Sequence, residues 1–126
     1  MASESAQFAA AGTICSSLDR ADGFIHLSDR SSAPTVARVF FANAADLKLI
    51  ELSVALVSSS VVWVVGQMGD AAPPAPLGDD AVTIHYMLPD GCVHVYGSSG
   101  VPTSAIIREA DVPLEADGTH KFPAWL

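Results

Sequence analysis

The sequence predicts an α+β domain in which five or six β-strands combine with two helices. Three observations support this prediction: short β-rich segments recur along the chain, two segments carry helix signals, and no internal repeat is present. With 126 residues, half of them hydrophobic, the chain is predicted to form one domain over residues 1–126. A chain of this length buries enough surface to fold without a metal ion or a disulfide.

The first predicted elements are a helix and a strand. Residues 3–11 predict a short helix with an N-cap serine and a stop at Gly12. The polar residues 18–23 predict a turn, and a strand is expected over residues 24–28. Alternation along that strand places three side chains on one face: Phe24, His26 and Ser28.

The clearest predicted helix follows that strand. Ser31 or Ser32 can cap it, and Pro34 suits its first turn, because the N–H that proline lacks has no partner there. Apolar residues then recur at three- and four-residue spacing, and Arg38 lies on the same helix. The start of the helix is a few residues from His26, so its free N–H groups are expected to make an anion site possible.

Five further strands are predicted, over residues 46–52, 61–65, 81–88, 92–96 and 103–110. The third and fourth of these form a hairpin, because Pro89-Asp90-Gly91 between them is a strong reverse-turn signal. Residues 66–80 hold three prolines and three glycines and predict a long, exposed, flexible loop. Residues 111–126 predict a tail from which Phe122 and Trp125 dock back.

The composition argues against several classes of protein. The net charge of −8, from 14 acidic and 6 basic residues, disfavours binding to nucleic acid or to anionic membranes, because both need clustered lysine and arginine. The longest apolar run, Val61 to Val65, is far short of the roughly 20 residues that cross a bilayer, and no signal peptide is recognised. Cys15 and Cys92 lack CxxC spacing and are interpreted as reduced thiols of a cytoplasmic protein. The four scattered histidines predict no metal site.

Two predicted strands carry polar pairs at the same two-residue spacing, His26 with Ser28 and His94 with Tyr96. If these strands are neighbours, two imidazoles, a phenol and a hydroxyl meet in one cleft, where they can hold a phosphate or ribose or transfer a proton. Arg20 and Arg38 join the candidates, because a guanidinium binds carboxylate or phosphate through two hydrogen bonds. The alternatives are core histidines bonded to the backbone and arginines in surface salt bridges.

The segment from Leu18 to Ser28, Leu-Asp-Arg-Ala-Asp-Gly-Phe-Ile-His-Leu-Ser, resembles the signature of a small uncharacterised domain family. Three later segments match that family in order: Arg38 to Phe41, Asp46 to Glu51, and the His-x-Tyr-Gly motif at His94 to Gly97. The resemblance covers about residues 12–110. The chain departs from the family where Val64 follows Trp63, because the family commonly has a glutamate there.

This resemblance implies the ADP-ribosylation fold, a split, curved and mainly antiparallel β-structure around a cleft for a nicotinamide dinucleotide. It would place His26 and Tyr96 where transferases of that fold hold NAD. No reaction is implied, because a shared fold is a weak guide to function.

Three functions remain open from the sequence. The first is a small cytoplasmic domain that binds a nucleotide-like or other anionic small molecule in a cleft lined by His26, Ser28, Arg20, Arg38, His94 and Tyr96. The second is an ADP-ribosyl transfer enzyme that uses NAD, with Glu109 as its candidate carboxylate. The third is a non-catalytic interaction module. The sequence does not reveal the ligand, the reaction, the partner or the oligomeric state.

Overall fold

The computed structural model describes residues 2–58, 60–74, 81–97 and 100–126. Within them the helices are α1 (Ala2–Ala11), α2 (Ser17–Asp22), α3 (Ala33–Phe40) and α4 (Val54–Val57), with a 3-10 turn η1 (Thr103–Ala105). The strands are β1 (Thr13–Ile14), β2 (Ile25–Ser28), β3 (Leu47–Leu52), β4 (Ser60–Gly66), β5 (Ala81–Met87), β6 (Cys92–Tyr96), β7 (Val101–Pro102) and β8 (Ile106–Val112). The predicted α+β class is confirmed, although the described residues form four α-helices instead of two.

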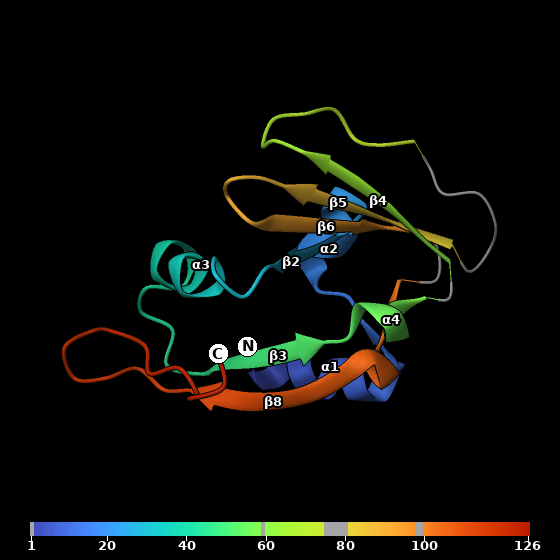
Figure 1. Ribbon diagram of the computed structural model, residues 1–126. Coiled ribbons are helices and arrows are strands. Elements are labelled where there is room, and N and C mark those ends of the chain that lie inside the picture. The colour runs from blue at the N-terminus through green and yellow to red at the C-terminus, as the bar shows by residue number, and fades with distance from the viewer. Residues whose placement is uncertain (1, 59, 75–80, 98–99) are drawn as a thin grey trace.

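The strands form three sheets, in the orders β1–β7, β2–β6–β5–β4 and β3–β8. Every pairing between these strands is antiparallel except that of β4 with β5, which is parallel. Figure 1 shows the four-stranded sheet as one layer and β3, β8 and α1 as the opposite layer. The predicted mainly antiparallel arrangement is therefore confirmed.

The hydrophobic core lies between these two layers. The four-stranded sheet contributes Ile25, Ile84 and Val95, which are almost fully buried. The smaller elements add Ile14, Val57, Val101 and Ala105. Because side chains alternate between the two faces of a strand, the residues next to these core positions point to the outer face of the four-stranded sheet.

The prediction of a turn over residues 18–23 is wrong, because this segment forms most of helix α2. Ser16 caps the helix through a capping box: the Ser16 hydroxyl accepts from the Asp19 N–H at 3.1 Å, and the Asp19 carboxylate accepts from the Ser16 N–H at 2.8 Å. Gly23 ends the helix with φ of +81°, a conformation that suits glycine. The signal for the helix was the Ser-x-x-Asp spacing at its start.

The capping predictions for the other helices also need correction. Helix α1 begins at Ala2, so Ser3 lies inside it and is not its N-cap. At the start of α3 the Ser32 side chain caps nothing; instead, the Asp29 carboxylate accepts from the Ser32 N–H at 2.8 Å and the Asp29 carbonyl accepts from the Ala33 N–H at 3.1 Å. The N–H groups of Ser32 and Ala33 are therefore already bonded, and Pro34 has none to offer. The anion site expected at the start of this helix stays a prediction.

The predicted hairpin is confirmed, since β5 and β6 are antiparallel and joined by a turn through residues 88–91. The parallel pairing of β4 with β5 explains the long segment that follows β4. Parallel neighbours require the chain to return along the full length of the strand, which a tight turn cannot do. Residues 67–74 contain neither helix nor strand, in agreement with the predicted loop, whereas residues 75–80 of that prediction lie outside the described residues.

The short elements α4, β1 and β7 were not predicted, because two to four residues are too few to show a hydrophobic period. At the C-terminal end, β8 extends to Val112, and an isolated bridge joins Leu114 to His120. Trp125 docks back as predicted: its ring lies 4.3 Å from the Arg108 guanidinium carbon. Among the described residues, no helix combines the length and the apolar character needed to span a membrane.

Candidate functional site

Three histidines from neighbouring strands lie side by side on the outer face of the four-stranded sheet. His94 of β6 is directly opposite His26 of β2 on one side and opposite His85 of β5 on the other. Residues directly opposite each other in an antiparallel pair project to the same face. These three residues are called the histidine row below, and they place the two predicted polar pairs next to each other.

The Phe24 ring packs against three other aromatic rings at one end of the histidine row. Its ring stacks on His94 with a centroid distance of 4.1 Å and lies 4.6 Å from His26 and 5.0 Å from Tyr96. The rings of His26 and His94 meet edge to face at 5.5 Å. The shared face predicted for Phe24 and His26 is confirmed, and the rings form one aromatic cluster.

Two carboxylates hold the His26 ring. Nδ1 lies 2.6 Å from Oδ1 of Asp19, and Nε2 lies 2.9 Å from Oδ2 of Asp22. The Asp19 side chain is only 7% exposed and also accepts from the His26 backbone N–H at 2.9 Å, whereas the Asp22 side chain is 43% exposed. A carboxylate only accepts, so both contacts are hydrogen bonds when each ring nitrogen carries a proton. The buried Asp19 therefore sets the orientation of His26, and Nε2 points toward the solvent side.

Three side chains on the same face as His26 are uncharged near neutral pH: His94, Tyr96 and Cys92. Burial lowers the pKa of His94, and the charges of His26 and His85 lower it further, so the His94 ring is neutral. Burial raises the pKa of the Tyr96 phenol. Burial also raises the pKa of Cys92, with Asp90 and Asp29 adding to the shift, so this thiol is a poor nucleophile. The site thus offers a neutral imidazole and a phenol beside a histidine held by carboxylates.

The structure brings four of the six predicted site residues together on one face of the sheet and places the two arginines on helices. His26, Ser28, His94 and Tyr96 share the outer face, with Ser28 opposite Cys92 at the end of β2. Arg20 lies on α2 and donates to the Cys15 carbonyl at 3.1 Å. Arg38 lines a separate pocket of about 270 Å³ between α3 and residues 118–122, with His120. Arg38 therefore lines a pocket that none of the other predicted site residues lines.

Three residues of the site were missed in the sequence: Asp19, Asp22 and His85. Asp19 and Asp22 lie within the segment 18–28, but their contacts with His26 depend on helix α2, which was not predicted. His85 joins the row through the register of β5 with β6, which the hairpin prediction alone could have suggested. In the described part of the chain, no cluster of three or more histidine, cysteine or carboxylate side chains is arranged to hold a metal ion.

Glu109, the carboxylate suggested for ADP-ribosyl transfer, lies on β8 in a different sheet from the histidine row. Its carboxylate is 3.9 Å from the Lys48 ammonium, which also pairs with Asp111 at 3.1 Å. Glu109 is therefore part of an ion-pair group on the β3–β8 sheet, and it does not join the aromatic cluster.

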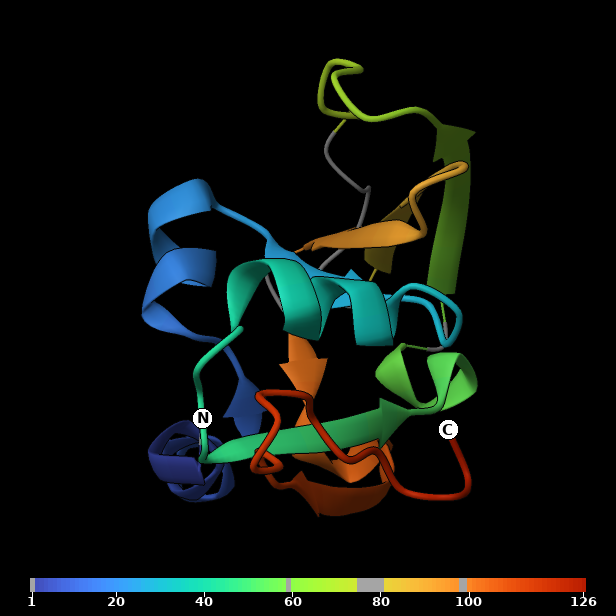
Figure 2. The same ribbon diagram turned by 90° about the vertical axis from the view of Figure 1, so that its left-hand side faces the viewer.

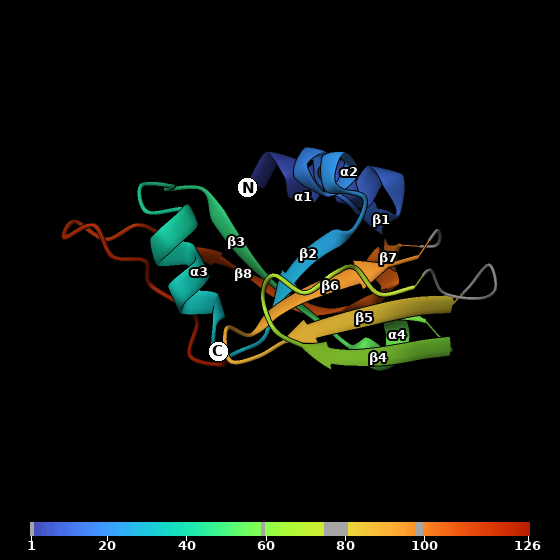
Figure 3. The ribbon, with the colours of Figure 1, turned by 90° about the horizontal axis from the view of Figure 1, so that it is seen from above.

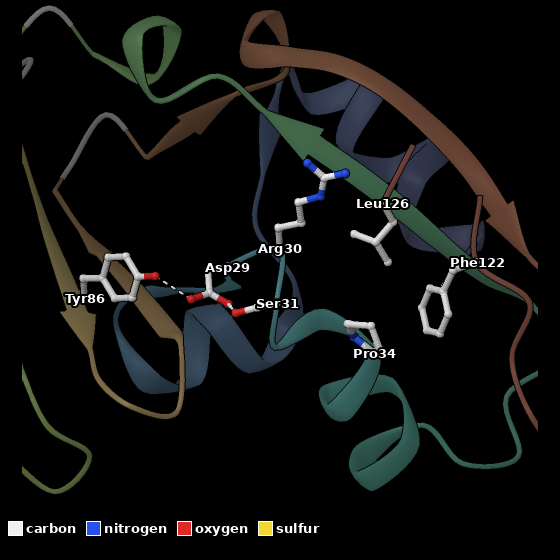
Figure 4. Close-up of a pocket in the computed structure, with 7 residues that line it drawn as sticks. All are labelled: Asp29, Arg30, Ser31, Pro34, Tyr86, Phe122 and Leu126. Atoms are coloured by element: carbon white, nitrogen blue, oxygen red, sulfur yellow. Dashed lines mark hydrogen bonds between the residues drawn. The ribbon is translucent and has the colours of Figure 1, made fainter. Parts of the chain in front are cut away.

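A larger open pocket of about 620 Å³ lies beyond the other face of the four-stranded sheet. Its lining residues are Asp29, Arg30, Ser31, Pro34, Tyr86, Phe122 and Leu126, and Figure 4 shows Tyr86 and Asp29 across the space from Phe122 and Leu126. The hydroxyl of Tyr86 donates to Asp29, which also accepts from the Ser31 hydroxyl at 3.0 Å. The bond from Tyr86 makes the largest contribution in holding the pKa of Asp29 at about 2, and it raises the pKa of Tyr86.

Removal of the Tyr86 hydroxyl is expected to raise the pKa of Asp29. In Tyr86→Phe the carboxylate loses its strongest donor, so its pKa should move from about 2 toward the ordinary 3.8. A depressed native pKa contributes stability that is present above the unfolded-state value, about 3.9, and is lost as the pH falls toward 2. The stability advantage of the wild type over Tyr86→Phe should therefore shrink between pH 4 and pH 2.

Carboxyl NMR titration measures this pKa, and urea unfolding at pH 6 and pH 2 measures the stability difference. Tyr96→Phe is the control, because the Tyr96 ring contacts Phe24 and belongs to the opposite face of the sheet. An Asp29 that titrates at the same pH in wild type and Tyr86→Phe would contradict the assignment of Tyr86 as its main donor.

Comparison with known proteins gives the following matches. A family model described as "Protein of unknown function (DUF952)" matches residues 1–109. The crystal structure of protein CC0527 from Caulobacter crescentus resembles this chain with a TM-score of 0.59 and 27% identity, over 94% of this chain and 86% of that one. A double mutant of the same Caulobacter crescentus protein gives the same values. No curated protein matches the chain. The predicted resemblance to an uncharacterised domain family is confirmed, whereas the resemblance to the ADP-ribosylation fold stays a prediction.

Proposed function

The chain belongs to the DUF952 family of proteins of unknown function, and we propose that its histidine row binds a nucleotide-like small molecule. The observation that supports this most strongly is the buried Asp19 that holds Nδ1 of His26 at 2.6 Å. This contact orients the ring so that Nε2, the other nitrogen, bonds to the exposed Asp22 carboxylate, and the His26 side chain stays 30% exposed. A buried carboxylate in this position is how proteins orient a histidine that handles protons.

The charges beside the row decide which part of the ligand it contacts. Asp19 and Asp22 together outweigh the single charge that His26 can carry, so the local field repels a phosphate. The aromatic cluster instead offers ring surface for a base, and His94 and Tyr96 offer a neutral acceptor and a donor for ribose hydroxyls. The proposal therefore places the nucleoside end of the ligand at the row and its anionic end away from it.

The proposal has a second candidate, ADP-ribosyl transfer from NAD, which one observation favours. The exposed Asp22 carboxylate bonds to His26, and its charge would attract the positively charged nicotinamide ring of NAD. The separation of Glu109 from the row leaves such a reaction without its predicted carboxylate. The proposal includes a cytoplasmic location, which suits the free thiols Cys15 and Cys92.

A thermal-shift experiment with NAD, ADP-ribose, adenosine and nicotinamide riboside tests the proposal. A ligand at 100 times its Kd adds about 2.7 kcal/mol to the folded state, which corresponds to a rise in Tm of about 10 °C in a domain of this size. His26→Gln should abolish the shift, because glutamine cannot reproduce the oriented Nε2. Lys48→Gln, on the other sheet, should retain it.

The outcomes separate the three functions. No shift with any of these ligands at millimolar concentration, or equal shifts in wild type and His26→Gln, would reject the binding site and leave the interaction module. A shift with NAD followed by release of nicotinamide, detected by chromatography, would favour the transferase. A shift without nicotinamide release would leave binding as the function.

A further inference from the structure

A second candidate site lies between helix α3 and the C-terminal segment. The pockets of about 620 Å³ and about 270 Å³ are neighbours, because Pro34 and Phe122 line both of them; together they are called the α3 groove below. Figure 2 shows α3 above β3, with the C-terminal segment crossing in front of that strand. The His120 ring is fixed there, because its Nε2 donates to the Ala44 carbonyl at 2.9 Å.

Two arginines line the α3 groove, and neither has a carboxylate partner among the residues that the structure describes. The chain has only six lysines and arginines against 14 acidic residues. Of these six, Lys48 and Arg108 form ion pairs. Arg30 donates to the Trp125 carbonyl at 2.9 Å, and Arg38 has no hydrogen bond or ion pair with any residue that the structure describes. Guanidinium groups without acidic partners in so acidic a chain indicate a place for an external anion.

We propose that the α3 groove binds a small organic oxyanion, a phosphate or carboxylate attached to an apolar body. Arg38 lies at one end and would bind the oxyanion, with Thr35 lining the same end. His120 forms part of the wall there and is held by its bond to the Ala44 carbonyl. The Phe122 ring, shared by both halves of the groove, packs against the apolar body.

The charge at the other end of the groove fixes the direction of the ligand. Asp29 lies there and stays ionised, since its pKa is about 2. Its oxygens already accept from Tyr86, Ser31 and Ser32, so most of the acceptor capacity of the carboxylate is used within the protein. Arg30 lines the same end and offsets the charge of Asp29, whereas no described carboxylate lines the pocket of Arg38. The anionic group is therefore attracted to Arg38, and the apolar body extends toward Phe122 and Tyr86.

This site is independent of the proposed function at the histidine row. Tyr86 lines the α3 groove, whereas its neighbour His85 belongs to the row. Consecutive residues of a strand project to opposite faces, so His85 and Tyr86 point to opposite faces of the four-stranded sheet. Figure 3 shows α3 to one side of that sheet, beyond the end of β2. A ligand of the α3 groove therefore makes no contact with His26, and either site can be absent without removing the other.

Isothermal titration with phenyl phosphate, benzoate and inorganic phosphate tests the proposal. Phenyl phosphate and benzoate each carry a ring that can pack against Phe122, so at least one of them is expected to bind more tightly than inorganic phosphate. Whichever of these two ring compounds binds more tightly identifies the preferred anionic group, phosphate or carboxylate. Arg38→Gln should weaken binding at least 10-fold. The charge-matched control, Lys48→Gln, should change the affinity less than 2-fold. Arg38 is exposed and has no described partner, so its variant should keep the wild-type Tm.

Three outcomes would overturn the proposal. One is no heat of binding for any probe at 10 mM. Another is an equal loss of affinity in Arg38→Gln and Lys48→Gln, which would show that binding depends on the net charge of the protein and not on the position of Arg38. The third is that His26→Gln loses binding of the anionic probe while Arg38→Gln retains it, which would show that the anion binds at the histidine row. If nucleosides fail to bind the row while Arg38→Gln still abolishes phenyl phosphate binding, the α3 groove stands without the proposed function.

Discussion

Replacement of Asp19 by asparagine is expected to destabilise the fold by about 2–3 kcal/mol, a large part of the stability of a domain of this size. One Asp19 oxygen accepts from the Ser16 N–H, and the other accepts from the backbone and ring of His26. An asparagine side chain has one oxygen and one amide, so in either orientation it turns an N–H toward a buried donor. Urea unfolding measures the loss, and Asp22→Asn, at an exposed carboxylate, should cost less than about 0.5 kcal/mol.

The cost of Asp19→Asn is also expected to depend on pH. Burial disfavours the charged carboxylate of Asp19, but the hydrogen bonds from Ser16 and His26 outweigh it and lower the pKa below 3.8. A lowered native pKa contributes stability above the unfolded-state value of about 3.9, and this stability is lost as the pH falls through the native value. The difference between wild type and Asp19→Asn should thus narrow below pH 4. A difference under 1 kcal/mol at pH 7 would show that Asp19 does not organise α2 and β2.

Gly97→Ala is expected to destabilise the protein by about 3 kcal/mol. Gly97 has φ of +150°, and a Cβ atom there would lie 2.8 Å from the Ala81 carbonyl oxygen and 3.1 Å from Cγ1 of Val82. Ala81 and Val82 begin the central strand β5 and are buried, so neither can move away without disturbing the sheet. This close approach gives the last residue of the His-x-Tyr-Gly motif a structural role.

Gly118→Ala is the control for this variant. Gly118 also has a positive φ, +86°, but a Cβ atom there would meet nothing within 4 Å. Its substitution should therefore cost only the backbone strain, about 1 kcal/mol. Equal losses of stability in the two variants, measured by urea unfolding, would show that contact with β5 adds nothing at Gly97.

Part of the candidate site could be predicted because local sequence decides it. Alternation along a strand placed His26 with Phe24 and His94 with Tyr96, and the reverse-turn signal at Pro89-Asp90-Gly91 joined the strand of His94 to its neighbour. These inferences depend on residues two to ten positions apart. The prediction that the two polar pairs meet was conditional on β2 and β6 being neighbours, and the structure satisfies that condition.

Arg38 shows where such reasoning fails. The sequence placed it on a helix that begins a few residues after His26, and proximity along the chain suggested proximity in space. The structure turns the helix toward the C-terminal segment, so Arg38 lines the same pocket as His120 and Phe122, more than 80 residues away in sequence. The direction of a helix relative to a sheet depends on which distant segment covers its apolar side, and no local pattern contains that information.

By itself, therefore, the sequence determined the α+β class, the hairpin, the helix that begins near Pro34 and the faces on which His26 and His94 lie. Only the tertiary structure decided that β4 is parallel to β5, that Asp19 holds His26, and that the predicted cleft is divided between the histidine row and the α3 groove. The physical reason is the range of the interactions. Turn and strand preferences act between near neighbours, whereas sheet order and helix orientation follow from burial of apolar side chains drawn from the whole chain.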